Sequence, residues 1–384
     1  MTPSAPRKDG KGYEKIIYYR GIELKKKYNF SIFVSHPVYR FYKKDNVEFI
    51  NGIKVLHVYP NFLDLFLSII KIILGHSVLT SIYNNSRLRS ILSEIDEGIY
   101  FNTSRCINSM QAIKCPIVVD FVDSMHLNFS RRVLTEKNFF YKLFWKYEAN
   151  KIKIHEQRVA AQANLCVCVS SIDAAVISDR FIQVLPLGVE IKYGGLKQDK
   201  RKVMGGGFSI VFSGNLNYQP NISAIVWFLD NCWLEILTVF PQASLSIVGR
   251  HCSQELFSYA SNIKQVSIVG EVEDMMTTLS TFDISIAPMV SGSGMQFKIL
   301  EAMGMGVPVI ATKIGLGDIK AEDMKHLMVR EGNQDFIEGV CALLRDSKLR
   351  RNLGSNGYEF VKTHHSWEEH NKNFMNLLEN ILQN

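Results

Sequence analysis

The chain has 384 residues, of which 47% are apolar and 21% charged, and a formal net charge of +7. This length predicts two domains with separate cores, and the composition excludes a mainly disordered or collagen-like chain. Residues 1–185 hold 26 Lys and Arg against 16 Asp and Glu, a balance of +10, whereas the remainder is close to neutral. A basic half is either a solvated face or one that attracts anionic membranes or substrates. Among the possible anionic partners nucleic acid is the least favoured, and we expect no nucleic-acid partner.

The first residues show neither a targeting signal nor a strand. Met1 to Lys11 is polar and lacks the apolar core of a secretory signal, so we expect a cytoplasmic protein. Gly10 and Gly12 form a glycine turn before a helical pattern. A doubly wound domain normally opens with a strand that feeds such a turn. We therefore expect the first strand to be missing or its place to be filled otherwise.

Short β-branched runs then alternate with longer amphipathic segments, which predicts a parallel sheet covered on both faces. The expected strands of the first half are Phe30–Val34, Ile53–Tyr59, Ile99–Asn102, Ile117–Val122 and Leu165–Val169. Tyr141 to Ala163 is typical of a long helix. The apolar run Phe62–Leu74 is too short and too interrupted to span a bilayer, and indicates a helix in the core or at a membrane surface.

A second alternating unit follows a polar, glycine-containing stretch, which is the best linker candidate. The expected strands are Phe208–Phe212, Leu245–Val248, Val266–Val269, Ile284–Ala287 and Val307–Ala311. The predicted fold is therefore α/β, with two tandem Rossmann-like, doubly wound domains. We predict a first domain over residues 1–190, a linker over 191–207, a second domain over 208–360, and a terminal helix over 361–384 that crosses back to the first domain.

A glycine-rich segment from Ser291 to Ile310 is the strongest chemical signal. Gly292 and Gly294 allow a ligand to approach the backbone, and the N-terminus of the following helix suits a diphosphate. Lys298 would add a full charge, and Glu301 would accept hydrogen bonds from a ribose diol. The alternative is an ordinary turn with both side chains solvated.

A second segment, Phe212–Ile222, also joins a strand end to a helix start. Gly214 stands alone where the dinucleotide fingerprint needs three spaced glycines, which disfavours a nicotinamide enzyme. Asn215 belongs to the same turn. Arg250 follows another strand end, in the position where a nucleotide base often lies.

These segments together resemble the retaining family-4 glycosyltransferases of the GT-B fold, especially the branch that builds bacterial exopolysaccharide and other surface glycans. The resemblance is strongest from Phe208 to Trp367 and weaker in the first half. It rests on Phe-Ser-Gly-Asn-Leu-Asn-Tyr-Gln-Pro-Asn from residue 212, Ser246–Arg250, Val269–Asp274, Ala287–Met289, Gly292–Pro308 and His365–Trp367. It implies two domains that face a cleft, with the sugar nucleotide held mainly by the second.

The resemblance also assigns site residues. The family's Glu, seven residues, Glu motif falls on Ser293 and Glu301, so that the Glu that binds the ribose is present and the first is replaced. The exopolysaccharide branch keeps a Gln and a Lys, which match Gln296 and Lys298. The basic pair that the family has after the first strand of the second domain is absent here. The expected donor-binding residues are Gly214, Asn215, Arg250, Ser293, Gly294, Met295, Gln296, Lys298 and Glu301.

In the first domain, polar residues follow the strand Ile117–Val122, where open α/β sheets bind ligands. Asp123 is expected to orient the acceptor hydroxyl or to stabilise positive charge at the anomeric carbon, and His126 to act beside it. A turn-capping Asp is the alternative. Gly10 and Gly12 stand where the family's first glycine-rich turn approaches the donor.

We therefore expect a glycosyltransferase that moves a sugar from a nucleotide diphosphate sugar to a growing, lipid-linked surface glycan with retention of configuration. It would need no metal or other cofactor, because helix dipoles and Lys298 would neutralise the leaving diphosphate. We expect it at the inner membrane face, through the basic first domain. A sugar-nucleotide epimerase of the same fold and a catalytically inactive partner protein are the alternatives.

Overall fold

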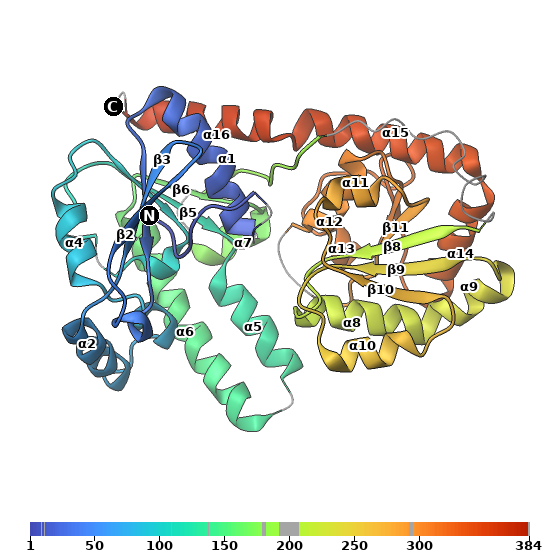
Figure 1. Cartoon of the computed structure of the whole chain (residues 1–384), viewed down its shortest axis with the longest axis horizontal. Coiled ribbons are helices and arrows are strands. Elements are labelled where there is room, and N and C mark those ends of the chain that lie inside the picture. Colours follow the sequence, from blue (N-terminus) through green and yellow to red (C-terminus); the bar gives the residue numbers. More distant parts are fainter. Residues whose placement is uncertain are drawn as a thin grey trace. The chain divides into compact units, whose positions relative to one another are not determined.

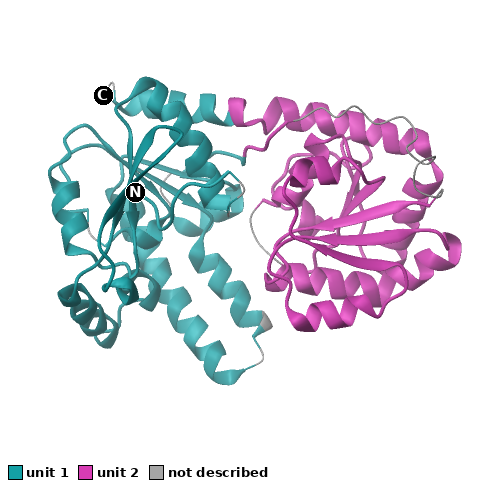
Figure 2. Cartoon of the chain, viewed as in Figure 1, with its two compact units in different colours: residues 1–187, 370–384 teal, residues 188–369 magenta. Residues whose placement is uncertain are grey.

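The chain divides into two compact units (Figure 2), one of residues 1–187 and 370–384 and one of residues 188–369. The computed structural model describes residues 1–8, 10, 12–108, 110–136, 138–178, 182–191, 207–291 and 295–382. The expected linker over 191–207 lies almost wholly outside these residues. The last helix, α16 (Trp367–Leu382), starts in the second unit and belongs to the first from His370 onward.

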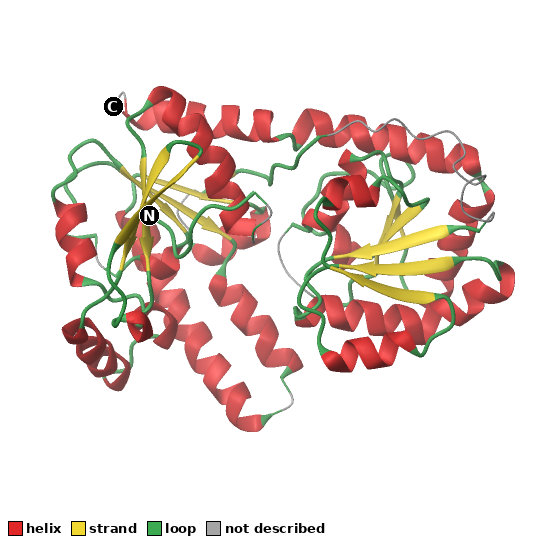
Figure 3. Cartoon of the chain, viewed as in Figure 1, coloured by secondary structure: helices red, strands yellow, loops and turns green. Residues whose placement is uncertain are grey.

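Unit 1 contains two sheets (Figures 1 and 3). In the first, β1 (Ser31–Ser35) pairs parallel with β3 (Ile53–Val58), and β3 pairs antiparallel with β2 (Asn46–Ile50). In the second, four parallel strands follow chain order: β4 (Ile99–Asn102), β5 (Ile117–Val122), β6 (Leu165–Cys168) and β7 (Gln183–Val184). Each strand expected in this half is present, with ends that differ by at most one residue. The sequence analysis did not predict β2 and β7.

Met1 and Thr2 connect the two sheets. The amide of Thr2 donates to Phe33 O at 3.0 Å, and the amide of Ser35 donates to Thr2 O at 2.9 Å. On the other side, the amide of Asn102 donates to Met1 O at 2.8 Å. The place of the expected missing strand is therefore filled by a two-residue pairing between β1 and β4.

The helices of unit 1 surround these sheets. They are α1 (Gly12–Lys27), η1 (Val38–Arg40), α2 (Phe62–Ile73), α3 (Val78–Ser81), α4 (Ser86–Ser93), η2 (Ser104–Cys106), α5 (Met125–Thr135), α6 (Phe139–Gln162) and α7 (Ser171–Ile177), with most of α16. Cores form around β5 and β6, which are buried along nearly their whole length, as expected for central parallel strands. Their carboxyl ends lead directly into α5 and α7.

Unit 2 is a doubly wound domain with one six-stranded parallel sheet. The strands are β8 (Ser209–Ser213), β9 (Ser244–Val248), β10 (Val266–Gly270), β11 (Ile284–Ala287), β12 (Val309–Ala311) and β13 (Met328–Val329). Their spatial order is β10-β9-β8-β11-β12-β13, which is the Rossmann order, so the sheet reverses its winding between β8 and β11. Ligands of such sheets bind at the carboxyl ends of the strands at this reversal.

The helices of unit 2 cover both faces of the sheet. They are α8 (Gln219–Phe228), the π-helical turn η4 (Leu229–Trp233), α9 (Leu234–Val239), α10 (Gln254–Ser261), α11 (Met275–Leu279), α12 (Phe297–Gly304), α13 (Lys313–Leu316), α14 (Asn333–Arg345) and α15 (Ser347–His364). Figure 1 shows α8 and α10 on one side of the sheet and α11 and α12 on the other.

One helical run among the described residues, Gln219–Val239, is long and apolar enough to cross a membrane. Its side chains Ile225, Phe228 and Trp233 are buried in the core of unit 2. Packing in this core accounts for its apolar composition.

Candidate functional site

The loops after β8 and β9 approach each other closely at the winding reversal. Gly214, directly after β8, has a φ of 155°, and its amide donates to Val248 O at 3.0 Å. Gly249, directly after β9, also has a φ of 155°, and a Cβ there would collide with the carbonyl oxygen of Gly214. Both positions therefore require glycine, and they bring two backbone loops together at the edge where a ligand would lie.

Lys298, in the first turn of α12, extends into this same place. Its ammonium group donates to Asn221 Oδ1 at 2.7 Å and to Gln296 Oε1 at 3.2 Å, and lies 3.5 Å from Met289 Sδ. It also lies 5.2 Å from the centroid of the Phe212 ring. Phe212 belongs to β8 and Met289 follows β11, so the lysine bridges the two strands that flank the reversal.

The side chain of Lys298 is 7% exposed, and its three polar partners within the described residues are neutral. Burial lowers its pKa from 10.5 to about 7, although the charge of Glu301 opposes this shift. Among the residues that the structure describes, no carboxylate contacts this ammonium group, so it is ready to receive an anion. The alternative of a solvated Lys298 is therefore wrong.

Glu301 stands one turn further along α12 and is partly buried, so the pair expected on one helix face is on that face. Gln296 is the residue before the first turn of α12, and Met295 before it is buried. Ser293 and Gly294, which were also expected to bind the donor, lie outside the described residues together with Gly292.

Asn221 was not among the expected site residues. It lies in the first turn of α8 and is 5% exposed; its Nδ2 donates to Asn215 O at 2.9 Å while its Oδ1 accepts from Lys298. It thus holds the lysine against the loop after β8. The sequence analysis singled out the segment that follows Gly214, which contains Asn221. However, no rule of residue spacing predicts a contact between Asn221 and Lys298. Arg250 also belongs here, since its carbonyl accepts from the amide of Leu216 at 2.9 Å.

In unit 1, the carboxyl end of β5 makes a strained turn. Val122 has a φ of 65°, which is unfavourable for a β-branched residue, and the amide of Asp123 donates to Phe121 O at 2.9 Å across it. The turn projects Asp123, whose carboxylate accepts from Asn128 Nδ2 at 2.7 Å. Burial, and secondarily the charge of Asp173, raises the pKa of Asp123. Strain of this kind concentrates at functional sites.

His126 lies on the first turn of α5, close in sequence to Asp123. Its Nδ1 is 2.8 Å from Ala149 O, so Nδ1 carries a proton and donates it to this carbonyl oxygen. The structure thus places both residues at the start of α5, on the strand edge where the sequence analysis predicted a site.

Glu156 of α6 was missed by the sequence analysis and lies beneath the same turn. It is fully buried and accepts from Ser124 Oγ at 3.0 Å and from the amide of Met125 at 2.8 Å. Burial raises the pKa of this carboxyl to about 8, despite these hydrogen bonds. The sequence alone does not distinguish a buried glutamate of a helix from a solvated one, because the difference lies in how the helix packs.

Asp120, two residues before Val122, uses its carboxylate for contacts that hold unit 1 together. It forms a buried ion pair with Arg20 of α1 and accepts from the hydroxyl of Tyr100 at 3.2 Å. Arg20 also donates from Nε to His370 Nε2 at 3.2 Å, and His370 donates from Nδ1 to Pro186 O at 2.7 Å. This network connects α1, β5 and α16 within unit 1.

The expected glycine turn lies at the start of α1. Gly10 is buried, and a Cβ there would meet the side chains of Glu14 and Arg7 within 3 Å. Gly12 is the first residue of α1. No contact among the described residues assigns either glycine to a ligand.

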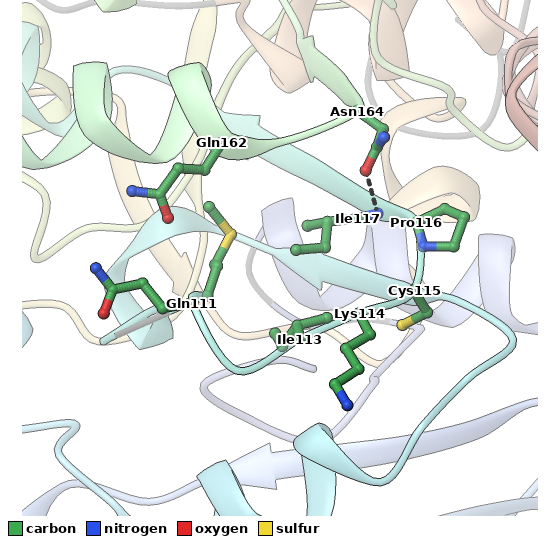
Figure 4. Close-up of a pocket in the computed structure, with 9 residues that line it drawn as sticks. Gln111, Ile113, Lys114, Cys115, Pro116, Ile117, Gln162 and Asn164 are labelled. Carbon is green, nitrogen blue, oxygen red and sulfur yellow. Dashed lines mark hydrogen bonds between the residues drawn. The ribbon is translucent and has the colours of Figure 1, made fainter.

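A hollow in unit 1 lies away from these residues, at the amino end of β5 (Figure 4). It is lined by Met110, Gln111, Ile113, Lys114, Cys115, Pro116, Ile117, Gln162 and Asn164. Asn164 Oδ1 accepts from the amide of Ile117 at 2.8 Å, which explains its position. The hollow is at the strand edge opposite the candidate site.

Within the part of the chain that the structure describes, no group of three His, Cys, Asp or Glu side chains could hold a metal ion.

Comparison with known proteins identifies unit 2. A family model described as "Glycosyl transferases group 1" matches residues 207–346, which contain the strands, the loops and the lysine described above. Over these residues unit 2 is similar to the glycosyl transferases of group 1, which are enzymes that transfer glycosyl groups.

Curated relatives match over part of the chain. A phosphatidyl-myo-inositol mannosyltransferase of Mycobacterium leprae is 26% identical over 132 residues, 33% of this chain and 35% of the relative. A "glycosyltransferase 1 domain-containing protein 1" of Xenopus tropicalis is 34% identical over 152 residues, 38% of this chain and 43% of the relative. An uncharacterised protein of the cps region of Klebsiella pneumoniae is 22% identical over 161 residues, 40% of this chain and 42% of the relative. Each match thus spans less than half of the relative.

Solved structures match over nearly the whole chain. HepE from Anabaena, in complex with UDP, has a TM-score of 0.65 at 15% identity and covers 99% of this chain and 98% of its own. Sucrose-phosphate synthase from Thermosynechococcus elongatus has a TM-score of 0.72 at 15% identity, with 99% and 96% covered. The expected GT-B fold of two Rossmann-like units is therefore confirmed.

Proposed function

We propose that the protein transfers a sugar from a nucleotide diphosphate sugar to a growing glycan with retention of configuration. The observation that carries this proposal is Lys298, a buried cation with neutral partners at the winding reversal of unit 2. A diphosphate suits this site, because its negative charge would compensate the positive charge of Lys298. That charge is costly to bury without an anionic partner. HepE, which shares the fold, has been solved with UDP and with UDP-glucose.

Each residue of the candidate site has a proposed role. Lys298 and the amides at the start of α12 neutralise the diphosphate as the bond to the anomeric carbon breaks. Glu301 accepts hydrogen bonds from the ribose diol. The loop of Gly214 and Asn215 and the neighbouring Arg250 border the nucleotide, together with Met295 and Gln296. Ser293 and Gly294, which lie outside the described residues, stay proposed donor-binding residues. The proposal requires no metal ion or other cofactor.

The proposed acceptor groups belong to unit 1. Asp123 orients the acceptor hydroxyl or stabilises positive charge at the anomeric carbon, and His126 acts beside it. Gly12, which is partly exposed, gives a sugar access to the backbone, whereas Gly10 is buried against Glu14 and Arg7 and shapes the turn before it. Because the transferred sugar keeps its configuration, the acceptor oxygen bonds on the face that the diphosphate leaves.

We further propose that the acceptor is a lipid-linked surface glycan and that the protein works in the cytoplasm, at the inner membrane face. The basic balance of residues 1–185 supports this placement. The similarity to a protein of a cps region is in keeping with a role in surface glycans, including exopolysaccharide.

Incubation of the purified protein with a panel of nucleotide sugars tests the proposal. Transfer or slow hydrolysis of one donor supports it, whereas an epimerised donor indicates a sugar-nucleotide epimerase and absence of binding indicates an inactive partner protein. Glu301→Ala should weaken binding of the cognate nucleoside diphosphate by about ten- to a hundredfold, because charge-assisted hydrogen bonds contribute about 1.5–3 kcal/mol. Glu359→Ala, an exposed glutamate of α15 on the same unit, is the control and should bind as the parent does.

A further inference from the structure

Arg105 of η2, just after β4, is a partly buried cation whose contacts are all neutral in the part of the chain that the structure describes. The carbon of its guanidinium lies 5.1 Å from the centroid of the Tyr13 ring, and its Nη2 lies 3.9 Å from Met125 Sδ. Its Nε is buried and has no hydrogen-bond partner among these residues. No carboxylate of the described residues forms an ion pair with it. Because a guanidinium is always charged and only donates, Arg105 has unused donors for an anion.

The turn that carries Arg105 is strained. It begins at Thr103, which is β-branched and yet has a φ of 79°, and the amide of Thr103 donates to Asp120 O at 2.7 Å. Val122, at the end of the adjacent strand β5, is also β-branched and has a φ of 65°. A positive φ is unfavourable for both residues. Two such residues at neighbouring strand ends indicate a functional site, because strain of this kind persists where a function needs it.

Arg105 lies beside the proposed acceptor groups of unit 1. Met125, which it contacts, is the first residue of α5 and follows the turn of Asp123. Burial raises the pKa of Asp123, and the positive charge of Arg105 opposes this shift, so the two side chains interact without forming an ion pair. Tyr13, which the guanidinium also contacts, directly follows Gly12. The guanidinium therefore stands among the start of α1, the end of β4 and the end of β5.

We propose that Arg105 binds an oxyanion of the acceptor, so that the acceptor is an anionic glycan with a carboxylate or a phosphate close to the hydroxyl that receives the sugar. A planar guanidinium can hold two oxygens of either group with parallel hydrogen bonds. A neutral glycan would leave the charge of this partly buried side chain uncompensated. The inference rests on the proposed function for the statement that unit 1 binds the acceptor.

The alternative is that Arg105 serves only as a counter-charge that holds unit 1 together. The two roles differ in what removal of the charge does. A structural cation contributes to the stability of the fold, whereas a cation without an ion-pair partner contributes little until its ligand is bound. Arg105→Gln should accordingly unfold at about the urea midpoint of the parent. A large loss of stability in this variant would favour the structural role and contradict the inference.

Binding of small sugars by the full chain tests the inference without a donor. Titrations followed by NMR at constant ionic strength measure the affinity for methyl glucuronide, glucose 6-phosphate and methyl glucoside, which carry a carboxylate, a phosphate and no charge. Arg105→Gln removes the charge, and Arg105→Lys keeps the charge but not the planar group. Arg158→Gln, at an exposed arginine near the end of α6, is the matched control.

The parent should bind one of the two anionic sugars about tenfold or more tightly than methyl glucoside, and the preferred sugar identifies the oxyanion as a carboxylate or a phosphate. Arg105→Gln should lose this preference, Arg105→Lys should keep part of it, and Arg158→Gln should keep all of it. Absence of binding, equal affinity of the parent for the three sugars, or an undiminished preference in Arg105→Gln would overturn the inference. A preference that Lys298→Met removes and Arg105→Gln does not would place the anion in unit 2 and would overturn it as well.

Calorimetric titration of the parent with a nucleoside diphosphate separates this inference from the proposed function. Nucleotide binding without a preference for anionic sugars removes only the inference about the acceptor. A preference for anionic sugars that depends on Arg105, without nucleotide binding, removes only the donor site of unit 2.

Discussion

The ammonium group of Lys298 lies 2.7 Å from Oδ1 of Asn221, a residue 77 positions away in the chain. The contact connects the start of α12 with the start of α8, so the lysine is fixed from both sides of the winding reversal. Because the amide is neutral, it positions the lysine without cancelling the charge that a diphosphate would meet.

Substitutions of Asn221 should therefore differ in a specific order. Asn221→Ala removes a positioning contact and should weaken binding of a nucleoside diphosphate by about three- to tenfold, which is less than the loss of a direct hydrogen bond to a charged group because Asn221 acts only through the position of Lys298. Asn221→Asp should weaken it more, because a carboxylate would pair with Lys298 and compete with the ligand. Calorimetric titration of both variants tests this, with Asn262→Asp, at an exposed amide of unit 2, as the control. Equal or tighter binding by Asn221→Asp would contradict the role given to Lys298.

Protons should be taken up when a nucleoside diphosphate binds at pH 8. The pKa of Lys298 is lowered to about 7, so above that pH the lysine is largely neutral in the free protein, and an anionic ligand raises its pKa again. Affinity should accordingly fall as the pH rises from about 6.5 to about 8.5. Titration at pH 8 in buffers of different ionisation enthalpy measures the uptake, and Lys298→Met should abolish it. Identical uptake in Lys298→Met would assign the proton to another group.

Gly249→Ala should destabilise unit 2 severely. A Cβ at this position would collide with the carbonyl oxygen of Gly214, and backbone atoms of two sheet loops cannot both move away. Gly332→Ala is the matched control, since Gly332 also has a positive φ, 74°, but a Cβ there meets nothing within 4 Å. The control should cost only about 1 kcal/mol, the cost of the backbone conformation. Urea denaturation compares the two; similar midpoints would mean that the loops can separate.

Asp120→Ala should destabilise unit 1 by about 3–5 kcal/mol, because it leaves the buried guanidinium of Arg20 without its carboxylate. The exposed pair of Lys325 and Glu322 provides the comparison. Removal of that pair by Glu322→Ala should change the stability far less, because water screens an exposed ion pair. Urea denaturation followed by circular dichroism measures both changes. A small loss for Asp120→Ala would mean that Tyr100 and His370 suffice to hold Arg20.

The sequence predicted most strands because buried parallel strands are mainly apolar runs, as in Ile117–Val119 of β5 and Val309–Ala311 of β12. It did not predict β2, whose residues Asn46–Ile50 are almost all exposed although polar and apolar residues alternate from Asn46 to Phe49. It predicted a helix over Phe62–Leu74 but not its orientation, because an apolar run is equally compatible with a core and with an exposed face. Orientation is decided by the partners of Asp64 and Ser68, which lie on other segments.

The same limit applies to the candidate site. Lys298 and Glu301 were predictable because both stand in one motif at helical spacing. Asn221, Arg20 and Glu156 were not, since each acts through a contact with a segment at least 30 residues away. Local patterns carry no information on such contacts, which arise only when the sheets bring the strand ends together.

Glu156 should make unit 1 less stable as the pH rises through neutrality. Its pKa is raised from 4.5 to about 8 because it is buried, so the folded chain keeps the proton over a range in which the unfolded chain has lost it. The stabilisation from this group is therefore complete below pH 4.5 and is lost as the pH rises towards 8. Glu156→Gln retains an acceptor for Ser124 and Met125 without the ionisation, so its urea midpoint should vary less between pH 5 and pH 8 than that of the parent. Gln157→Ala, at an exposed residue of α6 without an ionisable group, is the control and should leave the pH dependence of the parent in place. If the parent and Glu156→Gln lose stability equally over this range, the proton is held elsewhere.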